Sequence, residues 1–513
     1  MTSDNGLLRP QRTAPRSLRA LAQHLNAAVV GDLAAGAATG ITLRSQDVRP
    51  GDVFVGLPGA GTHGAAFAAA AQQAGAVALL TDPTGAALAA GVDLPVLVVD
   101  DPRGLLGAAA AWLLRTEHAV PLLLGVTGTN GKTTTVTLID QLLRRLGRRT
   151  GVSTTAERAV DGIRVPSRLT TPEADELHGM LAAMRERRVD AAAIEVSAQA
   201  LVRARVAGVR FDVAGFTNLS HDHLDDFGDM ETYFAAKAGL FEPERARRGV
   251  VSLDSPWGAR LVARAGVPVT TIALEGDADW RVAITERSLD GTRFRVTAPD
   301  GRALETRVRM LGDHAAADAA LAVAMLVEGG VALEALQEAL GDDGFDVAVP
   351  GRLERLPSSP CGPAVHLDIA HTPDAFEKSL AALRAVTPGR IVMVFGADGD
   401  RDASKRFDMG RVAGSTADVV VVTDHHSRFE DPDAIRRALL RGARSTGRAE
   451  VLDVPDPGAG IRAAVAMSGP GDAVLWAGTG RTDYRDIGGR KIPYSFHAEA
   501  CAALAELQPA AAA

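Results

Sequence analysis

The segment that most constrains this chain is Gly128–Thr134, which reads GTNGKTT. It follows the apolar run Leu122–Val126 and precedes leucines spaced four residues apart, so the pattern predicts a strand, a tight turn and an amphipathic helix. In such a turn, glycines allow backbone N–H groups to face anionic oxygens at the positive end of the helix. Lys132 can then reach the β and γ phosphates, and the Thr133 hydroxyl can bind Mg²⁺. The segment therefore predicts a nucleoside triphosphate site that uses Mg²⁺. The plainer alternative is a glycine-rich turn with a surface lysine.

Strand-like and helix-like segments alternate along the chain in three blocks. Expected strands are 52–57, 76–80, 96–99, 122–126, 191–196, 213–217, 250–253, 391–395, 419–423, 451–454 and 473–476. Expected helices in the first block are 65–74 and 105–114. This alternation predicts an α/β fold with parallel sheets and crossover helices. The expected division is a disordered N-terminus over 1–17 and α/β domains over 18–115, 116–348 and 349–513.

Composition narrows the class of protein. A net charge of −8 is not that of a nucleic-acid-binding domain, which usually carries a basic face. The first 17 residues lack the apolar run of a signal peptide, and no run of about 18 apolar residues predicts a membrane span. Two cysteines, Cys361 and Cys501, lie far apart and fit a reducing compartment. We expect a cytoplasmic, monomeric protein that binds neither nucleic acid nor membrane.

Short motifs in a fixed order carry a family resemblance. They include Leu43–Asp52, GTNGKTT, Thr170–Pro172, Glu195–Ser197, Thr217–Ser220, Asp222–Asp225, Tyr233–Lys237, Pro350–Arg352, Asp368–Pro373 and Gly399–Asp402. Together they resemble the Mur ligase family over about residues 18 to 508, with the tripeptide synthetases as the most similar branch. The resemblance implies an N-terminal UDP-binding domain, a central ATPase domain with the phosphate loop and a C-terminal Rossmann-like domain.

The resemblance also implies a reaction. ATP phosphorylates a carboxylate of a UDP-N-acetylmuramoyl-dipeptide, and an amino acid then attacks the acyl phosphate to form an amide. The implied cofactors are ATP and Mg²⁺, and the partners are a UDP-linked muramoyl peptide and an amino acid. Arg352 is expected to reach the γ-phosphate from the third domain, so the site would be complete only when the domains close.

The expected site residues fall into five groups. Catalysis is assigned to Lys132, Glu195, His223, Lys237 and Arg352. ATP binding is assigned to Gly128, Thr129, Asn130, Gly131, Lys132, Thr133, Thr134, Asp318, Arg352 and Asp368. The UDP-linked substrate is assigned to Ser45, Thr62, His63, Thr170, Thr171, Ser197 and Arg205. The amino acid is assigned to Arg401, His426, Arg428, Gly478 and Thr482, and the metal to Thr133, Glu195, His223 and Lys237 as a carbamate.

Taken singly, several of these residues have simpler interpretations. Glu195 at a strand end is usually a solvated carboxylate, His223 a structural histidine and Lys237 an exposed helix lysine. The order of the surrounding motifs favours the functional interpretation of each. Glu195 offers the oxygen ligand that Mg²⁺ prefers.

The sequence departs from the family pattern at the expected amino-acid pocket. The family's DNPR segment is His425–Arg428 here, and its GKGHE segment is Gly478–Thr482, so the usual Asn and Glu are missing. Neither His426 nor Thr482 carries a fixed negative charge, so we expect a side-chain ammonium, as in diaminopimelate or lysine, to be poorly accepted. Glu430, Asp431 or Asp483 could replace the missing carboxylate.

Further departures lie near the expected nucleotide site. Ala315 and Asp318 stand for two Asn, Ile369 for Tyr, Ala198-Gln199 for Ser-His and Asp398 for Gly. The phosphate-handling residues are intact, which favours an active enzyme. Three hypotheses stay open: a peptidoglycan-type ligase, a specialised-metabolite amide ligase with another amino acid or acceptor, and a non-catalytic nucleotide-binding regulator. Folylpolyglutamate and cyanophycin synthetases share the loop but lack the 43–52 type of N-terminal domain.

Overall fold

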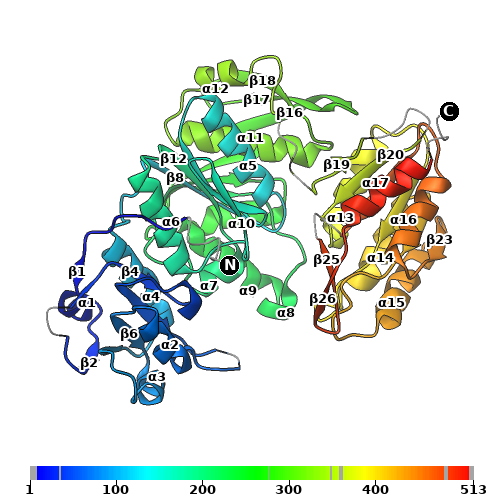
Figure 1. The fold of residues 1–513 in the computed structure, drawn as a ribbon. Helices are drawn as coiled ribbons and strands as arrows, with labels where there is room; N and C mark the ends of the chain where they lie inside the picture. Colours follow the sequence, from blue (N-terminus) through cyan, green and yellow to red (C-terminus); the bar gives the residue numbers. More distant parts are fainter. Residues whose placement is uncertain are drawn as a thin grey trace, which may run out of the picture.

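The computed structural model describes residues 8–33, 36–59, 61–274, 276–346, 349, 351–357, 362–478 and 483–507. Among the described residues, three large sheets follow one another along the chain, beside two two-stranded sheets. Figure 1 shows the large sheets in three bodies coloured blue, green and yellow to red. The expected α/β class is confirmed. Within the described residues, no helix is long and apolar enough to cross a membrane.

The first body contains a five-stranded sheet in the order β2-β7-β6-β5-β4. Strands β4 to β7 are parallel, and β2 pairs antiparallel with β7. The elements are β1 (Arg16–Ser17), α1 (Leu18–His24), β2 (Ala28–Val30), β3 (Ala37–Ala38), β4 (Gly40–Thr42), η2 (Ser45–Asp47), β5 (Asp52–Gly56), η3 (Gly64–Phe67), α2 (Ala68–Gln73), β6 (Ala78–Thr81), α3 (Pro83–Leu88), β7 (Val96–Val98) and α4 (Pro102–Leu114).

The second body is built on an eleven-stranded sheet in the order β11-β10-β9-β12-β8-β13-β14-β15-β16-β17-β18. Its first elements are β8 (Leu122–Thr127), α5 (Lys132–Arg145), β9 (Thr150–Ser153), β10 (Glu157–Val160), β11 (Ile163–Pro166), α6 (Ala174–Glu186), β12 (Ala191–Glu195), α7 (Ala198–Val202), β13 (Phe211–Phe216) and α8 (Leu224–Phe227). The rest are α9 (Met230–Ala238), η4 (Gly239–Phe241), β14 (Ala246–Ser252), α10 (Pro256–Arg264), β15 (Val269–Ala273), β16 (Trp280–Ser288), β17 (Gly291–Thr297), β18 (Ala303–Val308), α11 (Asp313–Glu328) and α12 (Leu333–Leu340).

The centre of this sheet is parallel and covered on both faces. Alternate residues of β8 and β12 point to opposite sides: Leu124 and Ala193 pack under α5 and α11, while Leu123 and Ala192 pack under α6 and α7. Parallel strands buried on both faces are expected to be apolar throughout. Because β12, β8 and β13 are parallel neighbours, their carboxyl ends meet at one edge of the sheet.

The third body contains a six-stranded sheet in the order β19-β20-β24-β21-β22-β23, parallel except for β19. Its elements are β19 (Glu354–Arg355), β20 (Ala364–Asp368), α13 (Pro373–Arg384), β21 (Ile391–Phe395), α14 (Arg406–Thr416), β22 (Val419–Val422), α15 (Pro432–Arg444), β23 (Glu450–Asp453), α16 (Pro457–Ala466), β24 (Ala473–Ala477), β25 (Tyr484–Ile487), β26 (Arg490–Pro493) and α17 (Phe496–Glu506). The hairpin β25–β26 lies outside the sheet.

One expectation for the N-terminus is wrong over residues 8–17. Leu8 is buried in the core of the second body, and the backbone N–H groups of Gln11 and Arg12 donate to Glu186 at 2.7 and 3.1 Å. Arg9 forms two hydrogen bonds, of 2.6 and 2.9 Å, with the buried Asp52 carboxylate. These contacts fix a segment that sequence composition alone suggested was disordered. Residues 1–7 lie outside the described residues.

Candidate functional site

The phosphate loop lies where the sequence pattern placed it, between β8 and α5. Gly128 and Gly131 have φ of 146° and 86°, a backbone region that favours glycine. Lys132 folds back over the loop, and its Nζ donates to the carbonyl oxygens of Gly128 and Thr129 at 3.0 and 2.8 Å. Its ammonium is therefore held at the concave face where phosphate oxygens would bind.

Glu195 connects this loop to the neighbouring strand end. The Thr133 hydroxyl donates to its carboxylate at 2.9 Å, and Lys132 Nζ lies 3.8 Å from it. Thr155 also donates to Glu195, from its backbone N–H at 2.8 Å and from its hydroxyl at 3.1 Å. Thr155 has no motif of its own, and sequence reasoning missed it. The adjacent hydroxyl and carboxylate oxygens of Thr133 and Glu195 fit the hard oxygen donors that Mg²⁺ requires.

Lys237 is buried on α9, contrary to the simple expectation of an exposed helix lysine. It is 1% exposed, its Nζ donates to the Gly128 carbonyl at 2.7 Å, and it lies over the Tyr233 ring at 4.4 Å. Burial, aided by the positive charge of Lys132, lowers the pKa of Lys237 well below its ordinary value. Burial and the neighbouring Lys132 charge therefore favour the neutral amine over the ammonium.

Asp222 and His223 follow β13 and face the same region. Asp222 is buried and accepts a hydrogen bond from Lys405 of the third body at 3.1 Å. Burial opposes its ionisation, but His371, Lys405 and His223 outweigh that effect and lower the pKa of Asp222. Burial lowers the pKa of His223, while Asp222 opposes the change. Sequence reasoning named Asp222 only as part of a motif and missed Lys405.

A cavity of about 600 Å³ lies between the second body and α13 of the third body. Its lining residues include Asn218, Trp257, His314, Asp318 and Lys378. Asp318 is buried on α11, where a Cβ placed on Gly131 would collide with its carboxylate. Burial raises the pKa of Asp318 to about 7, although Arg352, Lys378 and Lys132 oppose the shift.

The third body contributes Asp374 and Lys378 to the cavity lining. Asn130 of the loop donates to Asp374, in the first turn of α13, at 3.1 Å. Arg352 lies near enough to influence the pKa of both Lys132 and Asp318. Asp368 is also buried, but its oxygens accept hydrogen bonds from Ala370, Leu353 and Ser379.

The residues expected to bind the UDP-linked substrate form two groups. In the second body, the Thr171 hydroxyl donates to the Glu195 carbonyl at 2.8 Å and accepts from the Ser197 N–H at 3.0 Å. The hydroxyl oxygens of Thr170 and Thr155 lie 3.1 Å apart, and Arg205 pairs with Glu173 at 3.0 Å. Ser45, Thr62 and His63 lie in the first body, where His63 Nε2 is 3.2 Å from Asp82. The two bodies meet where the Leu43 N–H donates to Asp175.

In the third body, the segments that follow strands β22 and β24 contain His426, Arg428 and Gly478. A Cβ on Gly478 would contact the carbonyl oxygens of Ala370 and Gly396, so the ends of β20, β21 and β24 converge. Arg401 is exposed on the turn before α14, and Thr482 lies outside the described residues. Sequence reasoning placed Asp398 among the departures near the nucleotide site, but it lies here instead.

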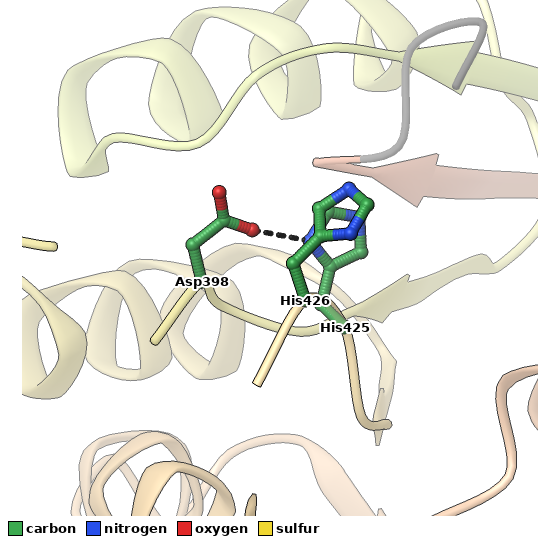
Figure 2. Close-up of side chains that lie close together, drawn as sticks. All are labelled: Asp398, His425 and His426. Atoms are coloured by element: carbon green, nitrogen blue, oxygen red, sulfur yellow. Dashed lines mark hydrogen bonds and ion pairs between the residues drawn. The ribbon is translucent and has the colours of Figure 1, made fainter. Parts of the chain in front are cut away.

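Asp398 contacts two residues of the segment His425–Arg428, which stands for the family's DNPR segment. Its Oδ1 lies 2.6 Å from His425 Nδ1 (Figure 2). Its Oδ2 lies 3.3 Å from Arg428 Nη2. Burial opposes ionisation, but the hydrogen bond from His425 and the nearby histidine and arginine charges lower the pKa of Asp398. Burial lowers the pKa of His426 to about 4, so this ring is neutral at neutral pH. Asp398 therefore places a carboxylate beside His426, which itself carries no negative charge.

The fold and the site define a multidomain α/β enzyme that uses a nucleoside triphosphate. Three family models match the chain: the Mur ligase family catalytic domain over residues 37–112, the Mur ligase middle domain over 126–326 and the Mur ligase glutamate ligase domain over 351–480. A UDP-N-acetylmuramyl-tripeptide synthetase of Leifsonia xyli subsp. xyli is 54% identical over 97% of this chain and 98% of its own length. The chain belongs to the Mur ligase family, and it is an ATP-dependent amide ligase.

Other relatives agree with this assignment. A UDP-N-acetylmuramoyl-L-alanyl-D-glutamate–2,6-diaminopimelate ligase of Streptomyces avermitilis is 45% identical over 89% of this chain and 90% of its own length. A solved structure of a ligase with the same name is 26% identical, with a TM-score of 0.65 over 97% of this chain and all of that chain. MurF from Acinetobacter baumannii shares the fold, with 19% identity and a TM-score of 0.68 over 91% of this chain and 96% of its own.

Proposed function

We propose that the enzyme joins an amino acid to the carboxylate of a UDP-N-acetylmuramoyl-dipeptide through an acyl phosphate. The observation that carries the proposal is the position of Glu195. Its carboxylate contacts Thr133 of the phosphate loop, while its backbone carbonyl accepts from Thr171 of the expected acceptor segment. A γ-phosphate and an acceptor carboxylate would therefore meet at one strand end. The proposed domains are 18–115, 116–348 and 349–513.

The first step transfers the γ-phosphoryl group. A carboxylate oxygen of the acceptor attacks the γ-phosphorus, the bond to the bridging oxygen breaks, and ADP leaves. Lys132 and Arg352 supply positive charge around the transferred group, as preorganised cations do in such sites. Mg²⁺ held by Thr133 and Glu195 would offset the remaining phosphate charge.

Lys237 has the chemistry of a carbamate precursor. Its neutral amine can attack CO₂ and lose a proton, which turns a buried cation into a carboxylate facing the loop. With His223, this group would hold a second Mg²⁺, whereas an unmodified ammonium would repel one. The lowered pKa of Lys237 and its contact with Gly128 support this role.

The second step forms the amide. The amino group of the incoming amino acid attacks the acyl carbon, and phosphate leaves from the tetrahedral intermediate. We assign the amino acid to Arg401, His426, Arg428, Gly478 and Thr482 of the third body. The loop that follows β21 reaches from this region to Asp402 and Lys405, which lie 3.3 Å from His221 and 3.1 Å from Asp222.

The acceptor is proposed from the names of the relatives and from the residues beside Glu195. The relatives are named for a muramoyl tripeptide or for a muramoyl-alanyl-glutamate substrate. Thr170, Thr171, Ser197 and Arg205 would contact the dipeptide, and Ser45, Thr62 and His63 the uridine end. Because ATP and UDP-linked sugars are cytoplasmic metabolites, the same proposal places the enzyme in the cytoplasm. The site described lies within one chain, so we propose that a monomer is active.

The test is product formation with purified enzyme, ATP, Mg²⁺ and a panel of acceptors and amino acids. We expect a new amide and one phosphate per product with UDP-muramoyl-dipeptide, and no product with UDP-muramoyl-alanine or folate. A different acceptor giving the highest kcat/KM would indicate a specialised-metabolite ligase. ATP binding without turnover for any acceptor would indicate a regulator and contradict the proposal.

A further inference from the structure

The start of α6 is where the first body rests on the second body. Ala174 of this helix packs into the hydrophobic core of the first body. Asp175, the next residue, accepts a hydrogen bond from the Leu43 N–H at 2.9 Å. Glu173, just before the helix, accepts from Arg103 Nη1 of α4 at 3.1 Å. Apolar packing and polar contacts therefore both fix the first body at this point.

Glu173 uses its two carboxylate oxygens for two different bodies. Its Oε2 accepts from Arg103 of the first body, and its Oε1 accepts from Arg205 Nε of the second body at 3.0 Å. Glu173 occupies the N-cap position of α6, yet its side chain makes no hydrogen bond to the backbone of that helix. The carboxylate is instead a bridge between two guanidinium groups.

Arg205 is the buried end of this bridge. Burial lowers the pKa of Arg205, and the charge of Glu173 opposes that change. Nε is held by Glu173, and Nη1 lies 3.5 Å from the Thr171 carbonyl oxygen. Because a guanidinium is planar, these contacts also fix the direction of Nη2. Among the described residues, none accepts a hydrogen bond from Nη2, so this donor remains for a ligand oxygen.

The bridge ends beside the proposed reaction centre. The Thr171 hydroxyl donates to the Glu195 carbonyl oxygen at 2.8 Å. A continuous series of contacts therefore runs from Arg103 on the first body, through Glu173 and Arg205, to the strand end that carries Glu195. A change in the position of the first body acts on Arg205 through this series.

We infer that Glu173 is a positioning residue, which holds Arg205 in the orientation that contacts the acceptor and is itself held by Arg103. The inference rests on the proposed function, because it takes Arg205 as a contact of the muramoyl-dipeptide. The body that is proposed to bind the uridine end then also fixes the arginine that is proposed to bind the peptide end. The bridge thus sets the distance between the contacts to the two ends of one substrate.

The simpler role for these charges is to stabilise the contact between the two bodies, as an ordinary partly exposed ion pair does. Both roles predict some loss of stability when a partner is removed. They differ in binding, because a positioning residue affects the acceptor only while Arg205 is present. The experiment therefore measures acceptor binding with and without Arg205.

Glu173→Gln is the test variant, because glutamine has nearly the same shape but a single acceptor oxygen, which cannot serve both arginines. Calorimetry gives the Kd for UDP-muramoyl-dipeptide, and initial rates give KM and kcat. We expect Kd and KM for this acceptor to rise about tenfold, the scale of one charge-assisted hydrogen bond. Both kcat at saturating acceptor and KM for ATP should stay within about twofold, because only acceptor binding is weakened.

Three further variants control for a general loss of structure. Arg103→Ala should raise Kd and KM for the acceptor about threefold, the scale of a partly exposed ion pair, and Arg103→Lys should restore them. Glu186→Gln changes an exposed carboxylate at the other end of α6 and should match the wild type. Melting temperatures report the folding of each variant.

A double-mutant cycle decides whether Glu173 acts through Arg205. In the Arg205→Ala background, we expect Glu173→Gln to change Kd for the acceptor by less than about twofold. Arg205→Lys is a second background, because lysine lacks the Nε donor that Glu173 holds. A tenfold effect that persists in these backgrounds, or a wild-type Kd in Glu173→Gln, would overturn the inference.

The outcomes separate this inference from the proposed function. If the wild-type enzyme binds UDP-muramoyl-dipeptide but forms no amide from it, the proposed function fails, and the calorimetric cycle still decides the role of Glu173. If amide forms but Arg205→Ala binds the acceptor as tightly as the wild type, Arg205 is not an acceptor contact. The positioning role of Glu173 is then wrong, although the ligase reaction stands.

Discussion

Lys237 is the residue that we expect to be chemically modified, from a free ammonium to a carbamate. A buried amine beside Lys132 is costly to charge, so modification to a carbamate relieves both burial and repulsion. We predict that Lys237→Ala loses at least about 100-fold in kcat, the scale of removing a preorganised charge. Short-chain carboxylic acids should restore at least about tenfold by entering the vacated space.

The acids should stimulate neither the wild-type enzyme nor Lys132→Ala, which keeps Lys237. Carbon-13 NMR of the wild-type protein in labelled bicarbonate should show a carbamate resonance that Lys237→Ala lacks. An unmodified lysine in the fully active enzyme would contradict the prediction.

Asp318 should make ATP binding sensitive to pH. Burial raises its pKa to about 7, so its carboxyl group is mostly neutral below pH 7 and mostly anionic above it. The neutral acid resembles the Asn of the family pattern, whereas the anion repels phosphate. We expect KM for ATP to rise a few-fold between pH 6 and pH 8 in the wild-type enzyme. In Asp318→Asn, the rise over the same range should be smaller. Parallel profiles for the two proteins would show that Asp318 does not titrate in this range.

At the scale of residues, the sequence predicted side chains that belong to one local motif. It missed side chains that contact partners far away in the sequence. Lys132 and Thr133 follow from the loop itself. Thr155 lies 40 residues from the Glu195 that it contacts, and Asp398 lies 27 residues from His425. Nothing in the spacing of such pairs indicates contact, so only the sheet register shows that they are neighbours.

The N-terminal segment is the element whose role is most open to a stability test. Arg9 holds the buried Asp52 carboxylate of β5, so Arg9→Ala would leave that charge without its main partner. We predict a loss of about 1–3 kcal/mol in the free energy of unfolding, measured by urea denaturation. Arg12→Ala, at an exposed position three residues further on, should change it by less than about 0.5 kcal/mol. Equal stabilities for the two variants would mean that the segment contributes little.

Elements were predicted well where their pattern is apolar and poorly where it alternates. The strands at 122–126 and 391–395 are buried on both faces and stand out as apolar runs. Strands β16 to β18 extend the central sheet with exposed charged residues on alternate positions, and the hairpin β25–β26 is mostly polar. Their hydrogen bonds to neighbouring strands hold them in place, and apolar content alone does not reveal this.

At the scale of the whole molecule, Lys405 and Asp222 connect the third body to the reaction centre. Both are buried, and their ion pair joins the loop after β21 to the segment after β13. We predict that Lys405→Ala lowers kcat about 10- to 100-fold through misplacement of the third body. Small-angle scattering with Mg²⁺ and ATP should show a larger radius of gyration, whereas Arg411→Ala, which changes an exposed side chain of α14, should match the wild type. A compact, fully active Lys405→Ala would show that the ion pair does not position the domain.

The central claim is that phosphate transfer from ATP activates the acceptor carboxylate at this site. The most direct measurement uses UDP-muramoyl-dipeptide labelled with ¹⁸O in that carboxylate, with ATP, Mg²⁺ and the best amino acid. If an acyl phosphate forms, one labelled oxygen leaves with phosphate in each turnover, and mass spectrometry should find singly labelled inorganic phosphate with ADP. Lys132→Ala should reduce its formation at least about 100-fold. Unlabelled phosphate, or label in AMP, would contradict the account.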